Sequence, residues 1–385
     1  MADDFEFGPA PPGKDSDSDF ADTFEYPVAF RFSFIGVGQA GGRIANTFRN
    51  IGYQRVCAVN TADADLAELP LAAEAKLTVG TSQGAGKDPD AAAAMFAAAD
   101  EDIFDLLKRN WGDNTDYGFV CLSGAGGTGA GAFPKVAEVV KRFMKSAGKP
   151  RRVGCIMALP KNVDGQRSAQ NALRSVNALQ SLNLSPILFI DNERFVELYG
   201  STITARDEKP KSNETTARLL HMVNRLSGTA SEDLGGTTFD PTDFSRVLDS
   251  GVLAMAAADL RQWNSSADIT TAVRDQLKAN VLASVDLTLG TVAGLLYVIG
   301  GAAWDGQNAV KVTDIDYGTD MLNRMLSGQN ASVFQGVYPR EGATFLKILA
   351  IVGGLPLPKL RLKALREKAG KDPRVDEVAR HLGIE

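Results

Sequence analysis

Two histidines and three cysteines are all that this 385-residue chain contains of the side chains most often used as soft or borderline metal ligands. With only His221 and His381, neither a histidine-based metal centre nor a Ser-His-Asp triad is expected. Cys57, Cys121 and Cys155 each lie inside an apolar, strand-like run. We interpret them as small buried side chains in a reducing compartment, because disulfides belong to oxidising ones. The sequence therefore predicts no metal ligands and no disulfide framework.

Long apolar runs are also lacking. None reaches the roughly 18–20 residues needed to span a bilayer, and the N-terminus has no basic start followed by an apolar core. The net charge of −6 argues against a nucleic-acid-binding surface over the whole protein. A hydrophobic content of 44% with 23% charged residues is typical of a globular protein. We expect a cytoplasmic protein that binds no nucleic acid and is long enough for two domains.

Glycine, in contrast, is abundant, and it gathers after apolar runs. The stretch Ala125–Gly131 (AGGTGAG) lies between the apolar run 117–122 and an amphipathic run that begins at Pro134. This order predicts a strand, a glycine loop and a helix. A helix N-terminus offers free N–H groups and a positive dipole end, so it is a site for an anion, above all a phosphate chain. For a single loop, a plain glycine-rich turn is an equal alternative.

Two further loops have the same form. Gly36–Gly41 matches G-x-G-x-x-G after a strand-like run, and the loop Gly84–Pro89 follows another short strand-like run. Loops at successive parallel strands converge on one crevice at the carboxyl ends of the sheet. The first pattern also raises a dinucleotide-dependent oxidoreductase as a hypothesis. The second strand, 55–59, ends in Asn60 where such a fold has an acidic residue, which counts against that hypothesis.

Strands and helices alternate from residue 29 to 192, which predicts a doubly wound α/β domain. The alanine-rich run 90–108 is expected to form one helix, capped by Asp88 or Asp90. We then expect a strand at 152–159, a helix at 168–182, a strand at 186–190 and a long helix at about 212–231. A second αβ region is expected to follow. Its strand-like runs are 295–299 and 311–315, its helical runs are 270–280 and 319–325, and the runs 331–337 and 344–352 complete it.

The two ends differ in charge. Residues 1–27 are acidic and contain interspersed phenylalanines, so disorder is expected there. They form either a short aromatic and acidic binding tail or a solvated leader. Lysines and arginines alternate with leucines from Lys359 onward. That segment either binds a membrane surface, an acidic partner or the acidic N-terminus, or it is a solvated helix packed on the body.

Taken together, the motifs resemble the tubulin/FtsZ superfamily over roughly residues 30–355. The stretch Ala125–Gly131 has the form of the tubulin signature, small-Gly-Gly-Thr-Gly-small-Gly. It is accompanied, in family order, by Gly38-Gln39-Ala40-Gly41-Gly42, Ala58-Val59-Asn60-Thr61, Gly84-Ala85-Gly86-Lys87-Asp88-Pro89 and Asp191-Asn192. The segments 60–66 and 84–89 are similar to the archaeal CetZ branch. The chain is thus identified as a prokaryotic FtsZ/CetZ-like protein, with the subfamily open.

This resemblance implies a domain plan and partners. A doubly wound GTP-binding domain would occupy 28–205, a long central helix 206–232 and a second α+β domain 233–356, between the acidic extension 1–27 and the basic tail 357–385. The ligand would be GTP or GDP, with Mg²⁺. The chain would associate head-to-tail with itself in filaments, and its tails could engage an adaptor or a membrane surface.

The resemblance also implies a set of site residues. The nucleotide would contact Gly38, Gln39, Ala40, Asn60, Ala85, Gly86, Ala125, Gly126, Gly127, Thr128, Gly129, Asp164, Arg167, Asn192 and Asn213. Residues 38–40 would approach the phosphates and residues 126–129 would cradle them, while Ala85 and Gly86 would lie near the γ-phosphate. Asp164 stands where the family has a ribose-binding Glu, and Asn192 where it has a guanine-reading Asn. For a second base-reading residue, Asn213, His221 and Asn224 remain candidates.

Family catalysis is divided between subunits, because an acidic loop after the central helix enters the pocket of the next subunit. Here that loop is Asp240–Arg246, and the resemblance implies Asp243 and Asp240 as its catalytic acids. Pro241 and Arg246 depart from the FtsZ pattern Asn-x-Asp-x-x-Asp. Asp240 could instead be a turn former, and Asp243 a helix N-cap. Two functions follow: a polymerising GTPase, or a nucleotide-binding scaffold with little or no turnover.

Overall fold

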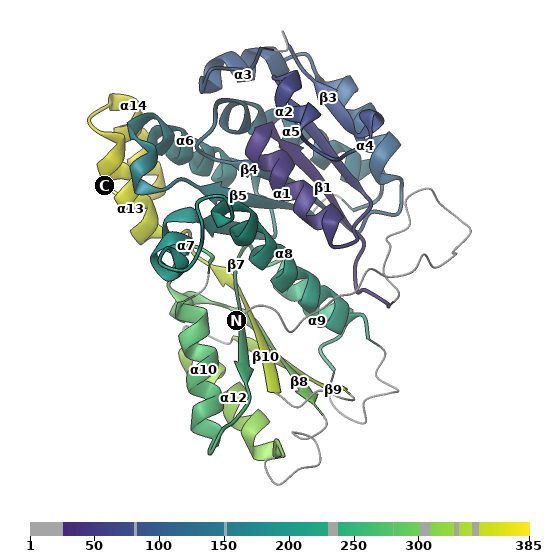
Figure 1. Ribbon diagram of the computed structural model, residues 1–385, viewed down its shortest axis with the longest axis vertical. Coiled ribbons are helices and arrows are strands. Elements are labelled where there is room, and N and C mark those ends of the chain that lie inside the picture. The colour runs from purple at the N-terminus through teal and green to yellow at the C-terminus, as the bar shows by residue number, and fades with distance from the viewer. Residues whose placement is uncertain are drawn as a thin grey trace.

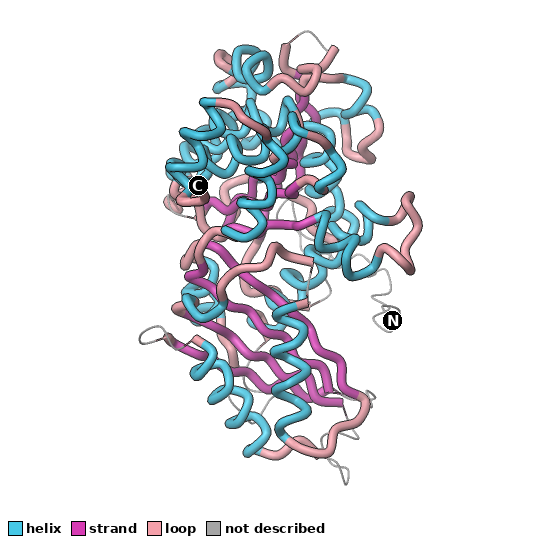
Figure 2. Tube along the Cα trace, turned by 90° about the vertical axis from the view of Figure 1, so that its left-hand side faces the viewer, coloured by secondary structure: helices cyan, strands magenta, loops and turns pink. Residues whose placement is uncertain are grey.

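The computed structural model describes residues 26–80, 83–149, 152–229, 238–279, 281–300, 309–326, 331–340 and 346–385. The acidic extension expected at 1–27 therefore lies almost wholly outside the described residues. Figure 1 shows an elongated molecule in which an upper, helix-covered part and a lower part are joined by the long helix α8 (Glu208–Ser227). The same division is visible from the side in Figure 2.

Within the described residues, ten strands form one sheet in the order β3-β2-β1-β4-β5-β6-β7-β10-β8-β9. The strands are β1 Phe32–Val37, β2 Val56–Asn60, β3 Lys76–Thr78, β4 Tyr117–Ser123, β5 Val153–Leu159, β6 Ile187–Asp191, β7 Val252–Leu260, β8 Val292–Gly300, β9 Ser332–Arg340 and β10 Leu346–Leu355. The first six pair in parallel. The chain order reverses between β1 and β4, and at such a switch point the loops diverge and leave a crevice.

The helices of the upper part are α1 Gly38–Asn50, α2 Asp63–Ala67, α3 Pro89–Phe96, α4 Asp100–Trp111, α5 Gly127–Ser146, α6 Gln166–Leu182 and α7 Asn192–Tyr199, with short 3-10 turns η1 Ala73–Ala75 and η2 Asn162–Asp164. After α8 follow α9 Pro241–Leu248, α10 Ser266–Lys278, η4 Leu287–Leu289, α12 Val312–Met325, α13 Lys359–Ala369 and α14 Pro373–Leu382. Parallel strands followed by helices confirm the doubly wound α/β prediction for the first part of the chain.

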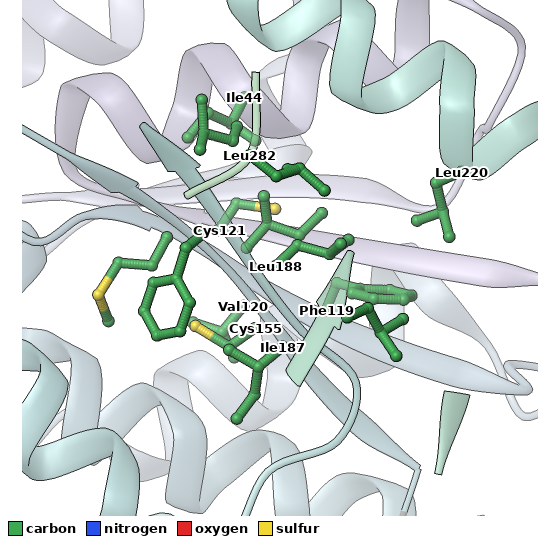
Figure 3. Close-up of a cluster of buried hydrophobic side chains, with 14 of the residues drawn as sticks. Ile44, Phe119, Val120, Cys121, Cys155, Ile187, Leu188, Leu220 and Leu282 are labelled. Atoms are coloured by element: carbon green, nitrogen blue, oxygen red, sulfur yellow. The ribbon is translucent and has the colours of Figure 1, made fainter. Parts of the chain in front are cut away.

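The core lies where the central parallel strands are covered on both faces. Phe119, Val120 and Cys121 of β4 are fully buried, and Leu188 of β6 packs nearby (Figure 3). Cys57, Cys121 and Cys155 are free and buried, as expected, and burial raises the pKa of each thiol. These thiols therefore stay protonated and act as small apolar side chains.

The predictions for two segments, one helix and one strand, were wrong. The run 90–108 is not one helix: α3 ends at Phe96 and α4 begins at Asp100. Three acidic residues in the first turn of α4 favour a new N-terminus there. The run 311–315 is not a strand but the start of α12, where the backbone N–H of Lys311 donates to the carboxylate of Asp314 at 2.9 Å. This capping interaction outweighs the β-branched residues of the run.

Some strands and helices were not predicted from the sequence, or were predicted with other bounds. It placed no strand at β7 and no helix at α7, and it began the helix after the signature loop at Pro134, whereas α5 begins at Gly127. The long helix is shorter than 212–231 at its C-terminal end and begins earlier, at Glu208. One expectation is confirmed: Asp88 caps α3, accepting hydrogen bonds from the backbone N–H groups of Asp90 and Ala91.

The basic C-terminal segment forms the helices α13 and α14, which lie against α6 at the side of the upper part (Figure 1). Leu362 and Leu365 are buried in this contact. Of the interpretations left open by the sequence, the helix packed on the body is the one that the structure supports. No helix among the described residues combines the length and apolar character needed to cross a membrane.

Candidate functional site

A cavity of about 590 Å³ lies at the carboxyl ends of the parallel strands, where the sheet order reverses. Its volume is in the range of small-molecule and cofactor sites. The predicted residues that line it are Gly38, Gln39, Ala40, Asn60, Ala85, Gly86, Ala125, Gly126, Gly127, Thr128, Gly129, Asp164, Asn192 and Asn213. The three glycine loops thus converge on one crevice, as their positions after parallel strands predicted.

Two helix N-termini open onto this cavity. Helix α1 begins at Gly38, directly after β1, and α5 begins at Gly127, with Gly126 as its N-cap. Neither N-cap residue places a side chain on the first-turn N–H groups. These donors and the dipole ends therefore remain available to an anion.

Glycine is required where the loops meet. Gly38 has φ +72°, a conformation that other residues rarely adopt. A Cβ on Gly127 would lie 2.7 Å from the Cα of Lys87, in the neighbouring loop. The second and third glycine loops can therefore pack directly against each other only without a side chain at this position.

At the end of the cavity formed by the glycine loops, hydrogen bonds between side chains hold the polar groups in place. The Thr61 and Thr128 hydroxyls lie 2.7 Å apart. The carboxylate of Asp65 accepts from Asn60 Nδ2 at 3.0 Å and from Gln39 Nε2 at 2.8 Å. The network joins β2, α1 and α5, so the groups facing the cavity are positioned in advance.

The opposite end of the cavity is built by η2, α7 and α8. Asp164 ends η2, where its carboxylate accepts from the Lys161 backbone N–H at 2.8 Å. Asn192 begins α7, and Asn213 lies in the second turn of α8. The ion pair between Lys161 and Glu208, at 2.9 Å, ties the η2 segment to the start of α8. Three segments far apart in the sequence therefore place polar side chains on one cavity wall.

Arg167 is the predicted contact that the structure does not bring to the cavity. It is absent from the described lining residues, and its Nη2 lies 4.0 Å from Asp88 Oδ2. The sequence reading in turn missed four charged residues of the lining: Arg43, Asp65, Lys87 and Lys209. Lys87 and Asp65 stood inside motifs already quoted. Nothing in the sequence pointed to Lys209, which the start of α8 carries to the cavity.

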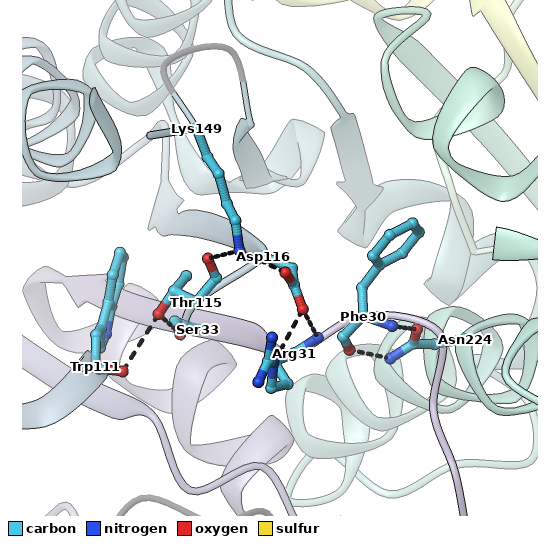
Figure 4. Close-up of polar contacts among 8 residues, drawn as sticks. All are labelled: Phe30, Arg31, Ser33, Trp111, Thr115, Asp116, Lys149 and Asn224. Atoms are coloured by element: carbon cyan, nitrogen blue, oxygen red, sulfur yellow. Dashed lines mark hydrogen bonds and ion pairs between the residues drawn. The ribbon is translucent and has the colours of Figure 1, made fainter. Parts of the chain in front are cut away.

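The candidates for a second base-reading residue separate clearly. Asn213 lines the cavity, whereas His221 and Asn224 lie further along α8 and are buried. Asn224 bonds to both the N–H and the carbonyl of Phe30, each at 2.9 Å (Figure 4). The same close-up shows the carboxylate of Asp116 accepting hydrogen bonds from both Arg31 and Lys149. These bonds also anchor the chain just before β1. His221 and Asn224 thus have structural roles.

His221 gives a prediction about pH. Its ring lies 2.8 Å from the Tyr26 hydroxyl and 3.1 Å from the Tyr53 hydroxyl, and burial lowers its pKa to about 4. In the unfolded chain the pKa is about 6.5, so below that pH the unfolded state takes up a proton that the folded state refuses. The free energy of unfolding should therefore fall by about 3 kcal/mol between pH 7.5 and pH 4 from this group.

The measurement is urea unfolding across that pH range, with His221→Gln as the comparison. The variant should be less stable at neutral pH, because a buried hydrogen-bonding ring is replaced. Its stability should depend less on pH than that of the wild type. Parallel pH profiles for the two proteins would contradict a neutral buried His221.

The acidic loop lies beyond the other end of α8. Asp240 is the N-cap of α9, and its carboxylate accepts from the Asp243 backbone N–H at 2.9 Å. The N-cap role expected as the alternative for Asp243 thus belongs to Asp240. Asp243 lines a second cavity, of about 460 Å³, together with residues of α12 and β9. Burial and the Asp240 charge raise its pKa, and the nearby Arg246 opposes that change.

The distance along α8 separates Asp243 from the first cavity. The helix has 20 residues, which corresponds to about 30 Å. Its first turns carry Lys209 and Asn213 into the cavity, and α9 lies beside its far end (Figure 1). Asp243 therefore cannot reach a ligand in the cavity of its own chain.

Comparison with known proteins agrees with this architecture. The Tubulin/FtsZ family, GTPase domain, matches residues 31–200. The tubulin-like protein CetZ of Thermococcus kodakarensis is 27% identical over 341 residues, which cover 84% of this chain and 82% of that protein. The tubulin-like protein TubZ of Bacillus cereus is 24% identical over 253 residues, or 61% of this chain and 56% of that protein. The match with TubZ thus spans little more than half of that relative.

Solved structures show the same fold over nearly the whole chain. A GTPγS-form protofilament of TubZ from Bacillus thuringiensis serovar israelensis has a TM-score of 0.75 at 18% identity and is covered over 94% of each chain. Both CetZ and TubZ proteins are among the relatives, so the subfamily stays open. Members of this superfamily are GTP-binding, filament-forming cytoskeletal proteins. The chain thus resembles the tubulin/FtsZ superfamily in sequence over residues 31–200 and in fold over nearly its whole length.

Proposed function

We propose that this protein binds GTP in the 590 Å³ cavity, assembles head-to-tail with copies of itself, and hydrolyses GTP where two copies meet. The observation that carries the proposal is the position of Asp243, about one α8 length from the cavity of its own chain. A catalytic acid so placed requires a second copy. The two sites lie at opposite ends of α8, so a repeated head-to-tail contact can bring each Asp243 to the next cavity.

Within the cavity, the N-terminal amides of α1 and α5 are suited to the triphosphate, and Asp164, Asn192 and Asn213 to the ribose and base. Mg²⁺ takes oxygen ligands and is often held by one or two carboxylates with substrate phosphates. Asp65 supplies such a carboxylate at the phosphate end, so the residues fit the ion. The ion would neutralise phosphate charge. No group of three or more metal-binding side chains occurs among the described residues.

Hydrolysis of a phosphoric anhydride needs positioning and charge stabilisation more than covalent help. The raised pKa of Asp243 suits a carboxylate that orients the attacking water and accepts its proton. Asp240 is already engaged as the α9 N-cap, so its proposed role is to hold Asp243 in place.

A second candidate function is a scaffold that binds GTP and assembles with little turnover. Arg246, which lies one turn after Asp243, favours it, because its guanidinium lies 5.5 Å from the Phe334 ring centre, beside the same cavity. A cation there would bind phosphate charge without orienting water. Sedimentation with GTP, together with phosphate release, separates the two functions. Pelleting with phosphate release supports the GTPase, and pelleting without release supports the scaffold.

The hydroxyl of Thr128 gives a direct test of the cavity. Thr128→Ala removes a cavity-lining group whose hydroxyl is held by Thr61, so GTP affinity should fall about five- to tenfold, the value of one hydrogen bond. The dissociation constant can be measured by titration with a fluorescent GTP analogue. Thr47→Ala, on α1 but outside the lining, is the matched control. An unaltered affinity in Thr128→Ala would refute the placement of the phosphates.

A further inference from the structure

Arg361, on the C-terminal helix α13, is a buried arginine that bonds to two loops of the GTPase domain. Only 8% of it is exposed. Its Nε donates to Asp191 Oδ1 at 3.0 Å and its Nη1 to Asn162 Oδ1 at 2.7 Å, while Nη2 donates to the carbonyl of Pro160. One guanidinium therefore bonds to the loop after β5 and to the end of β6.

Both loops carry residues of the cavity wall. Asp191 is the N-cap of α7 and directly precedes Asn192. Asn162 begins η2, which ends at Asp164. Asn162 is also bonded to Glu193, through its backbone N–H at 2.7 Å and its side chain at 3.0 Å. The bonds of Arg361 to Asp191 and Asn162 are thus one residue away from Asn192 and two residues away from Asp164, and its third partner, Pro160, itself lines the cavity.

The helix that carries Arg361 is firmly placed. Leu362 and Leu365 are buried against the body. Gln166 and Gln170 of α6 both donate to the carbonyl of Ala369 at 3.0 Å, at the end of α13. The hairpin of α13 and α14 is therefore packed firmly on the part of the protein that carries the cavity, although it comes last in the chain.

The partners of Arg361 depend on it electrostatically. The side chain of Asp191 is only 5% exposed, and its burial raises the pKa of the carboxyl in spite of the nearby guanidinium. A buried carboxylate that loses its cation is strongly destabilised and must move, hydrate or take up a proton. Any of these changes disturbs the N-cap of α7, and with it the backbone that carries Asn192.

We propose that Arg361 is a positioning residue for nucleotide recognition, through which the docked C-terminal hairpin holds the ribose-and-base wall of the cavity in its binding shape. The proposal rests on the proposed GTP site. It assigns to the basic C-terminal segment a role inside its own domain. The phosphate end of the cavity, built by α1, α2 and α5, makes none of these bonds and should not depend on Arg361.

The test measures the dissociation constants of GTP and of inorganic tripolyphosphate for wild type and Arg361→Met. Loss of Arg361 should weaken GTP binding at least tenfold and leave tripolyphosphate binding within twofold. Arg361→Lys, which keeps the charge beside Asp191 but cannot make the three bonds, should give an intermediate loss of GTP affinity. Arg366→Met is the matched control, because Arg366 lies on the same helix and bonds to Asp376 of α14 instead. It should change GTP affinity less than twofold.

The outcomes separate the two proposals. If wild type binds no GTP, the proposed function fails. If wild type binds GTP and Arg361→Met binds it equally well, the positioning role is overturned while the GTP site stands. Equal weakening of GTP and tripolyphosphate also overturns it, because that pattern indicates a general loosening of the domain. If Arg361→Met does not fold, Arg361→Lys decides by the same ratio of affinities.

Discussion

Asp243→Ala should slow GTP hydrolysis about 100-fold while leaving GTP binding and filament assembly intact. The expected size follows from the loss of a carboxylate that orients water and accepts its proton. Binding should be unaffected, because Asp243 lies beyond the far end of α8 from the cavity of its own chain. Filaments should persist longer, since hydrolysis no longer removes the bound GTP. Phosphate release in saturating GTP, with sedimentation in parallel, measures both effects.

Mixing experiments sharpen this test. A variant with a blocked cavity, such as Gly126→Phe, still carries Asp243. Nothing lies within 4 Å of a Cβ at Gly126, which lines the cavity, so a large side chain there can fill the cavity without displacing the backbone. Neither variant alone should release phosphate at more than about a hundredth of the wild-type rate. Mixed in equal amounts, they should recover part of the activity, because the intact cavity of one meets Asp243 of the other. Turnover by Asp243→Ala alone at the wild-type rate would refute the catalytic role and favour the scaffold.

Gly41→Ala should lower the free energy of unfolding by about 3 kcal/mol, or prevent folding. A Cβ at this position would lie 2.2 Å from the carbonyl oxygen of Cys121 and 3.1 Å from the Cα of Leu122. Both atoms belong to the backbone of β4, at the centre of the sheet, so neither can give way cheaply. Helix α1 would have to move off the sheet. Urea unfolding without nucleotide measures the loss.

The matched control is Gly126→Ala. Nothing lies within 4 Å of a Cβ at Gly126, so its unfolding midpoint without nucleotide should equal that of the wild type. The contrast distinguishes glycine needed for close packing from glycine needed near a ligand. A Gly41→Ala protein as stable as Gly126→Ala would show that α1 does not pack on β4 as described.

Much of the cavity could be predicted from the sequence, because local patterns encode it. An apolar run followed by glycines and an amphipathic run predicts a strand, a tight turn and a helix, and parallel strands bring such turns to one edge. The position of Asn192 after β6 followed the same logic. Arg167, which only the family resemblance implied, does not line the cavity, and its guanidinium lies 4.0 Å from Asp88 instead.

Errors outside the cavity have local causes. The alanine-rich run 90–108 has high helix propensity throughout, so only the acidic start of α4 marks the break. The run 311–315 contains β-branched residues but is turned into a helix by Asp314. In both cases a capping interaction decided the element, and a hydrophobic pattern does not report caps well.

By itself, the sequence determined the doubly wound sheet, the three converging glycine loops and the presence of an acidic loop after a long helix, because these depend on residue type and short spacing. The tertiary structure alone decided which residues share a cavity across long separations. It selected Asn213 over His221 and Asn224, placed Asp243 a helix length from the cavity, and brought Arg361 to Asp191, 170 positions earlier. The physical reason is that burial and charge pairing act through space, after the chain has folded.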